Sequence, residues 1–207
     1  MSSTSNLSDS TLTVSAFNCR SLKSSISEVR ELCDTSDLVL LQEHWLLPFE
    51  LDQLNTLHPD FFAMSKSAVD VHQSILRGRP YGGTAILFRK TLTEYITPVN
   101  SDDPRICALK YASSIGPVLF VCVYMPTDMN DFDSLERYNN TCAKISALFT
   151  DSDAVHLAII GDFNCNINSR FYDTFLELAA DNNLQLSDIN RLDNVFTYCS
   201  DGGCIPH

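Results

Sequence analysis

Polar side chains stand at the ends of three apolar runs of the sequence, where a buried strand would leave its sheet. Asn18 ends the first run, Glu43 ends the second, and Asp162 with Asn164 ends the last. Carboxylate and amide oxygens are hard ligands of the kind that Mg²⁺ binds, and open α/β sheets bind ligands beyond their strand ends. The pattern favours a Mg²⁺ site that neutralises a phosphate. A single carboxylate of this kind would more often cap a strand and contact water.

A fourth apolar run ends in Tyr124, two residues before Pro126. The tyrosine hydroxyl could donate a hydrogen bond to a phosphate oxygen, although an isolated aromatic residue more often lines the rim of a core. Gly82 and Gly83 begin another predicted strand and allow two backbones to approach closely. They do not form a Walker-type phosphate loop, because no Lys-Ser or Lys-Thr follows them.

The elements that would position these residues are those of a layered α/β fold. Alternating or continuous apolar runs predict strands over residues 11–18, 37–43, 61–67, 82–89, 106–113, 117–124 and 156–163, with a hairpin turn at 115–117. Apolar residues that recur every three or four positions predict helices over 25–34, 134–149 and 170–181. The strand, helix, strand order at the start of the chain predicts a parallel strand pair.

The length of 207 residues fits one domain, and 44% hydrophobic with 19% charged residues is typical of a folded protein. We expect a disordered tail over residues 1–10 and a single domain over 11–207. No apolar run approaches the roughly 20 residues of a membrane span, so we expect no membrane partner. The polar start of the chain lacks the features of a secretory signal, and we expect an intracellular, nuclear protein.

The net charge of −12 argues against a protein that simply coats nucleic acid, since phosphate binding depends on Lys and Arg. Residues 66–110 nevertheless contain seven basic side chains against four acidic ones, which allows one basic flank.

The eight cysteines include no C-x-x-C pair. We therefore expect reduced thiols rather than disulfides or a zinc site, with Cys33, Cys107, Cys122 and Cys142 acting as small apolar residues.

Taken in chain order, the polar motifs resemble those of the endonuclease/exonuclease/phosphatase superfamily. The resemblance spans residues 11–207 and is carried by Asn18, Leu41-Gln42-Glu43, Gly82-Gly83-Thr84-Ala85, Val123-Tyr124-Met125-Pro126 and Gly161-Asp162-Phe163-Asn164. The segments 17–22 and 42–46 are most similar to the apurinic-endonuclease-like domain of non-LTR (LINE-type) retrotransposons. Five motifs in matching order make a chance match improbable.

This resemblance implies an α/β fold, a four-layer α/β/β/α sandwich of two mixed, largely antiparallel sheets flanked by helices. It implies that Glu43 is the main Mg²⁺ ligand, with Mn²⁺ as a substitute, and that Asp162 orients or deprotonates the attacking water. Asn18 and Asn164 would hold the carboxylates and the phosphate, and Tyr124 would contact the scissile phosphate. The implied substrate is DNA, and the implied partner is a reverse transcriptase domain in a parent polyprotein.

Two further residues are candidates for substrate contact. Arg20 is the one basic residue close to the motifs, and His44 lies beside Glu43, where it would share a groove wall with Trp45. The family's last motifs, an S-x-x-D stretch and a final Ser-Asp-His, have no match before the chain ends at His207. We therefore expect a C-terminally truncated domain, its last strands missing, that folds poorly or nicks slowly.

Three functions stay open at this level. The first is a Mg²⁺-dependent endonuclease of retrotransposon type that nicks one DNA strand. The second is a phosphatase of the same superfamily that acts on small phosphodiesters or phosphoinositides, which the acidic balance favours. The third is a degenerate, non-enzymatic fragment, which the missing C-terminal motif favours.

Overall fold

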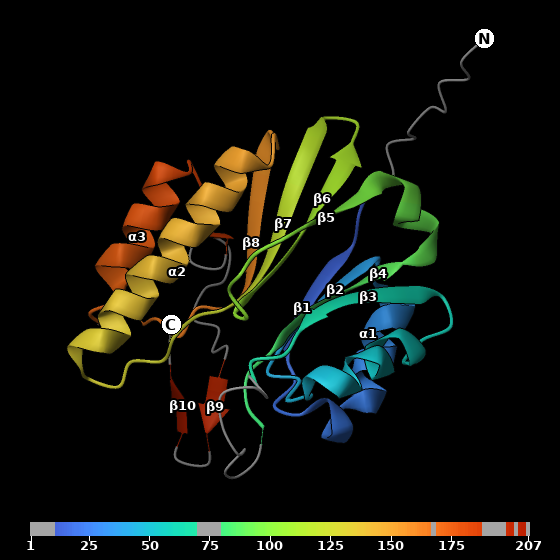
Figure 1. Ribbon diagram of the computed structural model, residues 1–207, viewed down its shortest axis with the longest axis horizontal. Helices are drawn as coiled ribbons and strands as arrows, with labels where there is room; N and C mark the ends of the chain where they lie inside the picture. The colour runs from blue at the N-terminus through green and yellow to red at the C-terminus, as the bar shows by residue number, and fades with distance from the viewer. Residues whose placement is uncertain (1–10, 70–79, 167–168, 188–197, 201–202, 206–207) are drawn as a thin grey trace. The chain divides into compact units, whose positions relative to one another are not determined.

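The computed structural model describes residues 11–69, 80–166, 169–187, 198–200 and 203–205 (Figure 1). The chain divides into two compact units, the first made of residues 1–125 and 147–163 and the second of residues 126–146 and 164–207. Each unit is described by itself. The expected tail over residues 1–10 lies outside the described residues. Among the described helices, none combines the length and the apolar character that crossing a membrane requires.

The first sheet of the first unit has the strand order β1-β2-β4-β3. Its strands are β1 (Val14–Asn18), β2 (Leu38–Gln42), β3 (Phe61–Lys66) and β4 (Thr84–Arg89). β1 and β2 are parallel and connected through helix α1 (Ile26–Thr35), which confirms the predicted parallel pair. The pairings of β4 with β2 and β3 are antiparallel. Two short 3₁₀ helices that the periodicity does not predict, η1 (Leu22–Ser24) and η2 (Pro48–Thr56), lie in the connections.

Strand β2 is buried along its whole length because both of its faces are covered. Val39 and Leu41 belong to a core cluster that includes residues of α1 and η2. Leu38 and Leu40 point to the opposite face and pack in the core between the two sheets. This arrangement explains the uninterrupted apolar run, since a strand covered on both faces has no side that favours polar residues.

The second sheet has the strand order β5-β6-β7-β8. Its strands are β5 (Ile96–Val99), β6 (Ile106–Ser113), β7 (Gly116–Tyr124) and β8 (His156–Asp162), with β7 and β8 parallel. The hairpin between β6 and β7 turns at residues 114 and 115, so the turn predicted at 115–117 is displaced: Gly116 and Pro117 already pair within β7. β5 escapes the sequence pattern because it is a four-residue edge strand that contains Pro98. It follows a third 3₁₀ helix, η3 (Lys90–Tyr95).

The two sheets pack face to face through apolar side chains from both. The shared core contains Leu38, Leu40, Ile86 and Phe88 from the first sheet and Cys107, Leu109, Phe120 and Cys122 from the second. Cys107 and Cys122 therefore act as small apolar residues, as predicted. The predicted α/β fold class with two mixed, largely antiparallel sheets is confirmed.

The second unit contains most of helix α2 (Phe132–Asp151), helix α3 (Tyr172–Asp181) and the antiparallel pair β9 (Tyr198–Ser200) and β10 (Gly203–Ile205). Helices α2 and α3 lie side by side (Figure 1), and the rings of Tyr138 and Phe171 stack at 4.3 Å between centroids. The helix starts differ by two residues from the starts predicted at 134 and 170, which is an ordinary displacement for helix ends.

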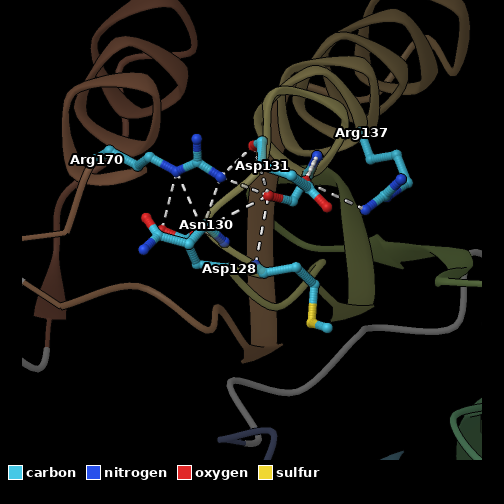
Figure 2. A network of polar contacts seen from close by, with 7 residues as sticks. Asp128, Asn130, Asp131, Arg137 and Arg170 are labelled. Atoms are coloured by element: carbon cyan, nitrogen blue, oxygen red, sulfur yellow. Dashed lines mark hydrogen bonds and ion pairs between the residues drawn. The ribbon is translucent and has the colours of Figure 1, made fainter.

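A polar network around Arg170 joins the segments that precede α2 and α3 (Figure 2). The Arg170 guanidinium donates from Nε and Nη2 to the Asp128 carboxylate, at 3.0 and 2.7 Å, and from Nη2 to the Asp131 carbonyl and Ser134 Oγ. Asp131 in turn accepts from the Ser134 backbone N–H at 2.6 Å. Arg170 holds the pKa of Asp128 below its usual range. The arginine thus acts as a clamp within the second unit.

The core between the sheets yields a first prediction. Replacing Leu40 by Ala removes a fully buried side chain from it and leaves a cavity, so we expect a loss of about 3 kcal/mol in the free energy of unfolding. The measurement is urea unfolding followed by circular dichroism. Ile115→Ala, at a side chain 74% exposed, is the matched control and should change stability by less than about 0.5 kcal/mol. Equal losses in the two variants would contradict the described core.

Candidate functional site

The ends of three strands of the first unit meet in one polar cluster. Asn18 is the last residue of β1, Asp162 is the last residue of β8, and Glu43 directly follows β2. The Asn18 side-chain amide donates one hydrogen bond to Glu43 Oε1 at 2.8 Å and one to Asp162 Oδ2 at 2.9 Å. The structure therefore brings together three of the side chains that the sequence nominates, and two of them are carboxylates.

The backbone orients the Asn18 amide. The backbone N–H of Arg20 donates to Asn18 Oδ1 at 3.3 Å, so the amide nitrogen is the atom that faces the carboxylates. Two carboxylates that share one amide lie close enough to repel each other. Charge-assisted hydrogen bonds from the amide offset part of this repulsion. Asn18 is thus the residue that makes the pairing of Glu43 and Asp162 stable.

Glu43 lies in a turn with unusual backbone geometry. Glu43 and Trp45 have φ angles of 55° and 56°, in the left-handed region that residues with side chains rarely adopt. Their backbone N–H groups donate to the carbonyls of Gly83 and Gly82, at 2.9 and 3.0 Å. The turn also places Trp45 Nε1 at 3.1 Å from Glu43 Oε2, to which it donates. Strain of this kind persists where the surroundings impose it, and it concentrates at functional sites.

His44 has a structural role in this turn, and the substrate contact predicted for it stays a prediction. The residue is 1% exposed. Its Nδ1 accepts a hydrogen bond from the Leu46 N–H at 3.0 Å, so Nε2 carries the proton and donates to the Lys66 carbonyl at 2.9 Å. Burial lowers the pKa of His44 from its ordinary value of 6.5. Both nitrogens of the neutral imidazole are therefore hydrogen-bonded to the backbone in this structure.

Two glycines permit the close contacts on which this cluster depends. A side chain at Gly83, where φ is 89°, would overlap the His44 ring. A side chain at Gly161 would overlap the carbonyl of Val123, so β8 approaches β7 very closely one residue before Asp162. The close approach that the sequence predicts at Gly83 is therefore an approach of backbone to an imidazole ring.

Tyr124 lies beside Asp162, because the two residues are register partners in the parallel pair of β7 and β8. Side chains of directly paired residues project from the same face of a sheet. The Arg105 guanidinium lies 5.7 Å from the centroid of the Tyr124 ring, and Arg105 Nη1 donates to the Tyr124 carbonyl at 3.3 Å. Sequence reasoning does not single out Arg105, since only the antiparallel pairing of β6 with β7 brings it next to Tyr124.

Two other predicted site residues, Arg20 and Asn164, differ in exposure and in the unit to which they belong. Arg20 is exposed, and the contact it makes with Asn18 comes from its backbone. Asn164 is half-buried with a φ of 47° and belongs to the second unit, so its predicted part in the site stays a prediction. His207 lies outside the described residues.

The donor set suits a magnesium ion. Within the part of the chain that the structure describes, no group of three or more His, Cys, Asp or Glu side chains is arranged to hold a metal ion. Magnesium needs fewer protein ligands, because it keeps several waters and is usually bound by one or two carboxylates together with substrate phosphates. The paired, half-buried carboxylates of Glu43 and Asp162 fit this requirement, and Glu43 would be the principal ligand.

Comparison with known families identifies the chain. The sequence model of the Endonuclease/Exonuclease/phosphatase family matches residues 15–204. The protein belongs to the Endonuclease/Exonuclease/phosphatase family. The match begins in β1 and ends in β10, so it includes every strand of both four-stranded sheets. Members of this family are hydrolytic nucleases and phosphatases. No curated protein sequence matches the chain significantly.

Solved structures of two endonucleases and a 3′ phosphatase show the same fold. The AP endonuclease LMAP from Leishmania major has a TM-score of 0.68 at 14% identity, over 92% of this chain and 73% of that one. The endonuclease domain of TRAS1, a telomere-specific non-LTR retrotransposon, has a TM-score of 0.56 at 11% identity, over 95% and 81%. The 3′ phosphatase NExo from Neisseria, bound to a product DNA hairpin, has a TM-score of 0.56 at 15% identity, over 83% and 71%.

The contact between Gly83 and His44 can be tested by a double-mutant cycle. We expect Gly83→Ala to destabilise the protein by about 2 kcal/mol or more, because the new methyl group overlaps the ring and the residue has a positive φ. In a His44→Ala background the ring is absent, and the same substitution should cost clearly less in urea unfolding. Equal costs in the two backgrounds would show that the ring does not occupy this space.

The buried His44 also predicts a pH dependence. Because its pKa is lowered in the folded state, the unfolded chain binds a proton that the folded chain does not, and stability falls as the pH drops below 6.5. His44→Gln can still accept from the Leu46 N–H and donate to the Lys66 carbonyl, but it does not titrate. Between about pH 6.5 and 5, the unfolding free energy should therefore fall more steeply for the wild type than for His44→Gln. Parallel pH profiles would be inconsistent with a buried neutral imidazole.

Proposed function

We propose that the protein is a Mg²⁺-dependent phosphodiesterase that nicks one strand of DNA as a retrotransposon-type endonuclease. The observation that carries the proposal is the single amide, that of Asn18, which joins the carboxylates of Glu43 and Asp162. Phosphodiester hydrolysis needs an aligned water and a cationic centre that bears the charge developing on the phosphate, and these two tasks require different carboxylates. The fold shared with an AP endonuclease and with a retrotransposon endonuclease domain supports DNA as the substrate.

Each residue of the cluster has a separate task in this proposal. Glu43 holds Mg²⁺ or Mn²⁺, which supplies the positive charge that stabilises the transition state. Asp162 orients the attacking water and accepts its proton. Asn18 keeps the two carboxylates in place, and the Tyr124 hydroxyl donates a hydrogen bond to an oxygen of the scissile phosphate. Asn164 assists in holding the phosphate, as the resemblance implies.

The proposal extends to the setting in which the protein acts. The similarity of segments 17–22 and 42–46 to LINE-type endonuclease domains supports a parent polyprotein with a reverse transcriptase. An enzyme of that kind acts on chromosomal DNA, and its place of action is the nucleus.

A plasmid assay tests the function. With Mg²⁺, we expect the chain to convert supercoiled plasmid slowly to the open-circular form and not to the linear form, because one strand is cut. Glu43→Gln and Asp162→Asn remove one carboxylate each and should reduce the nicking rate about 100-fold or more. Glu31→Gln, at an exposed position of α1, is the matched control and should nick at the wild-type rate.

Two outcomes would count against this assignment. Nicking that persists in EDTA, or in Glu43→Gln, would exclude the proposed metal site. Release of inorganic phosphate from a 3′-phosphorylated oligonucleotide without plasmid nicking would favour the second candidate, a phosphatase. That candidate is supported by the net charge of −12, which opposes binding of long DNA, and by the fold shared with the 3′ phosphatase NExo.

A further inference from the structure

The Glu43 carboxylate has a hydrogen-bond donor at each of its two oxygens. Asn18 Nδ2 donates to Oε1 at 2.8 Å, and Trp45 Nε1 donates to Oε2 at 3.1 Å. A carboxylate oxygen has two lone pairs, so one donor at each oxygen still leaves a lone pair for a cation. The two donors fix the plane of the carboxylate from opposite ends. Asn18 is one of the predicted site residues, whereas no role in the reaction has been assigned to the Trp45 indole nitrogen.

The position of the indole is a result of the backbone and not of chance proximity on a flexible loop. Residues 43 and 45 both have left-handed φ angles, and both are bonded through their N–H groups to the Gly82-Gly83 segment. Between them, the His44 ring is buried and committed to two backbone partners. The turn that carries Trp45 is therefore anchored at three successive residues, and the tryptophan ring itself is half-buried.

We propose that Trp45 is a positioning residue that holds the Glu43 carboxylate in the orientation required to bind a divalent cation. This inference rests on the proposed function, in which Glu43 is the metal ligand. Partners that donate hydrogen bonds to a metal ligand restrict its orientation, and their loss typically weakens metal binding by about 10- to 100-fold. Trp45 is also a fluorescence probe of the site, because it is the only tryptophan in the chain. Its emission reports directly on the environment of Glu43.

The test compares Mg²⁺ binding by the wild type, Trp45→Phe and a matched control. Trp45→Phe keeps a six-membered aromatic ring and removes the pyrrole part of the indole with its N–H, while Phe49→Leu changes an aromatic side chain 75% exposed on η2. Binding is measured by fitting the Mg²⁺-induced rise in melting temperature to a stabilisation of RT ln(1 + c/Kd), where c is the free Mg²⁺ concentration, and the midpoint is the fitted Kd, at which half of the sites are occupied. We expect this midpoint to rise about tenfold in Trp45→Phe and to stay unchanged in Phe49→Leu. In plasmid nicking, the Mg²⁺ requirement should rise tenfold, with little loss of rate at saturating Mg²⁺.

A second measurement needs no variant of Trp45. Titration of the wild type with Mg²⁺ should change the intrinsic fluorescence of Trp45, and Glu43→Gln should abolish that change. A wild-type Mg²⁺ midpoint in Trp45→Phe, or a Trp45 emission that Mg²⁺ leaves unchanged while the melting temperature rises, would overturn the positioning role alone. If neither the melting temperature nor the emission of the wild type responds to Mg²⁺, the metal site of the proposed function is wrong, and this inference is wrong with it.

Discussion

The amide nitrogen of Asn18 is the point on which the geometry of the cluster depends, because it bonds to carboxylates that belong to different sheets. Glu43 follows a strand of the first sheet, whereas Asp162 ends a strand of the second. A hydrogen bond tolerates only a few tenths of an ångström of displacement before it weakens. The spacing of the two sheets, which Leu40 and its neighbours in the core set, must therefore be kept to that tolerance. The core between the sheets thus determines the geometry of the cluster as well as the stability of the first unit.

Electrostatics imposes a second constraint under the proposed function. The net charge of −12 repels a polyanion at long range, although salt screens that repulsion beyond about 8 Å at physiological ionic strength. Attraction must then come from groups close to the phosphate, such as the cation held by Glu43. Arg105, next to Tyr124, adds a fixed positive charge at the same end of β7. A protein built in this way depends on short-range contacts rather than on general attraction to nucleic acid.

The sequence predicts the elements and much of the cluster, because both follow from local patterns. The continuous apolar run of β2 indicates a strand covered on both faces, and a polar residue at the end of each run indicates the edge at which Asn18, Glu43 and Asp162 meet. Contacts that depend on an unusual backbone are not predictable in the same way. The left-handed turn at Glu43 buries His44 and directs the Trp45 indole to the carboxylate, whereas the residue types alone suggest only that both side chains line a groove wall beside Glu43.

The hydrogen bond between Asn18 and Asp162 joins residues that are 144 positions apart in the chain. During translation, the N-terminal strands leave the ribosome first and can begin to pair while later segments are still being made. The two carboxylates cannot meet until β8 has emerged and docked beside β7. A nascent polypeptide therefore lacks the assembled cluster of Asn18, Glu43 and Asp162 for most of its synthesis. Under the proposed function, hydrolytic competence is acquired late, after the last strand of the second sheet has been added.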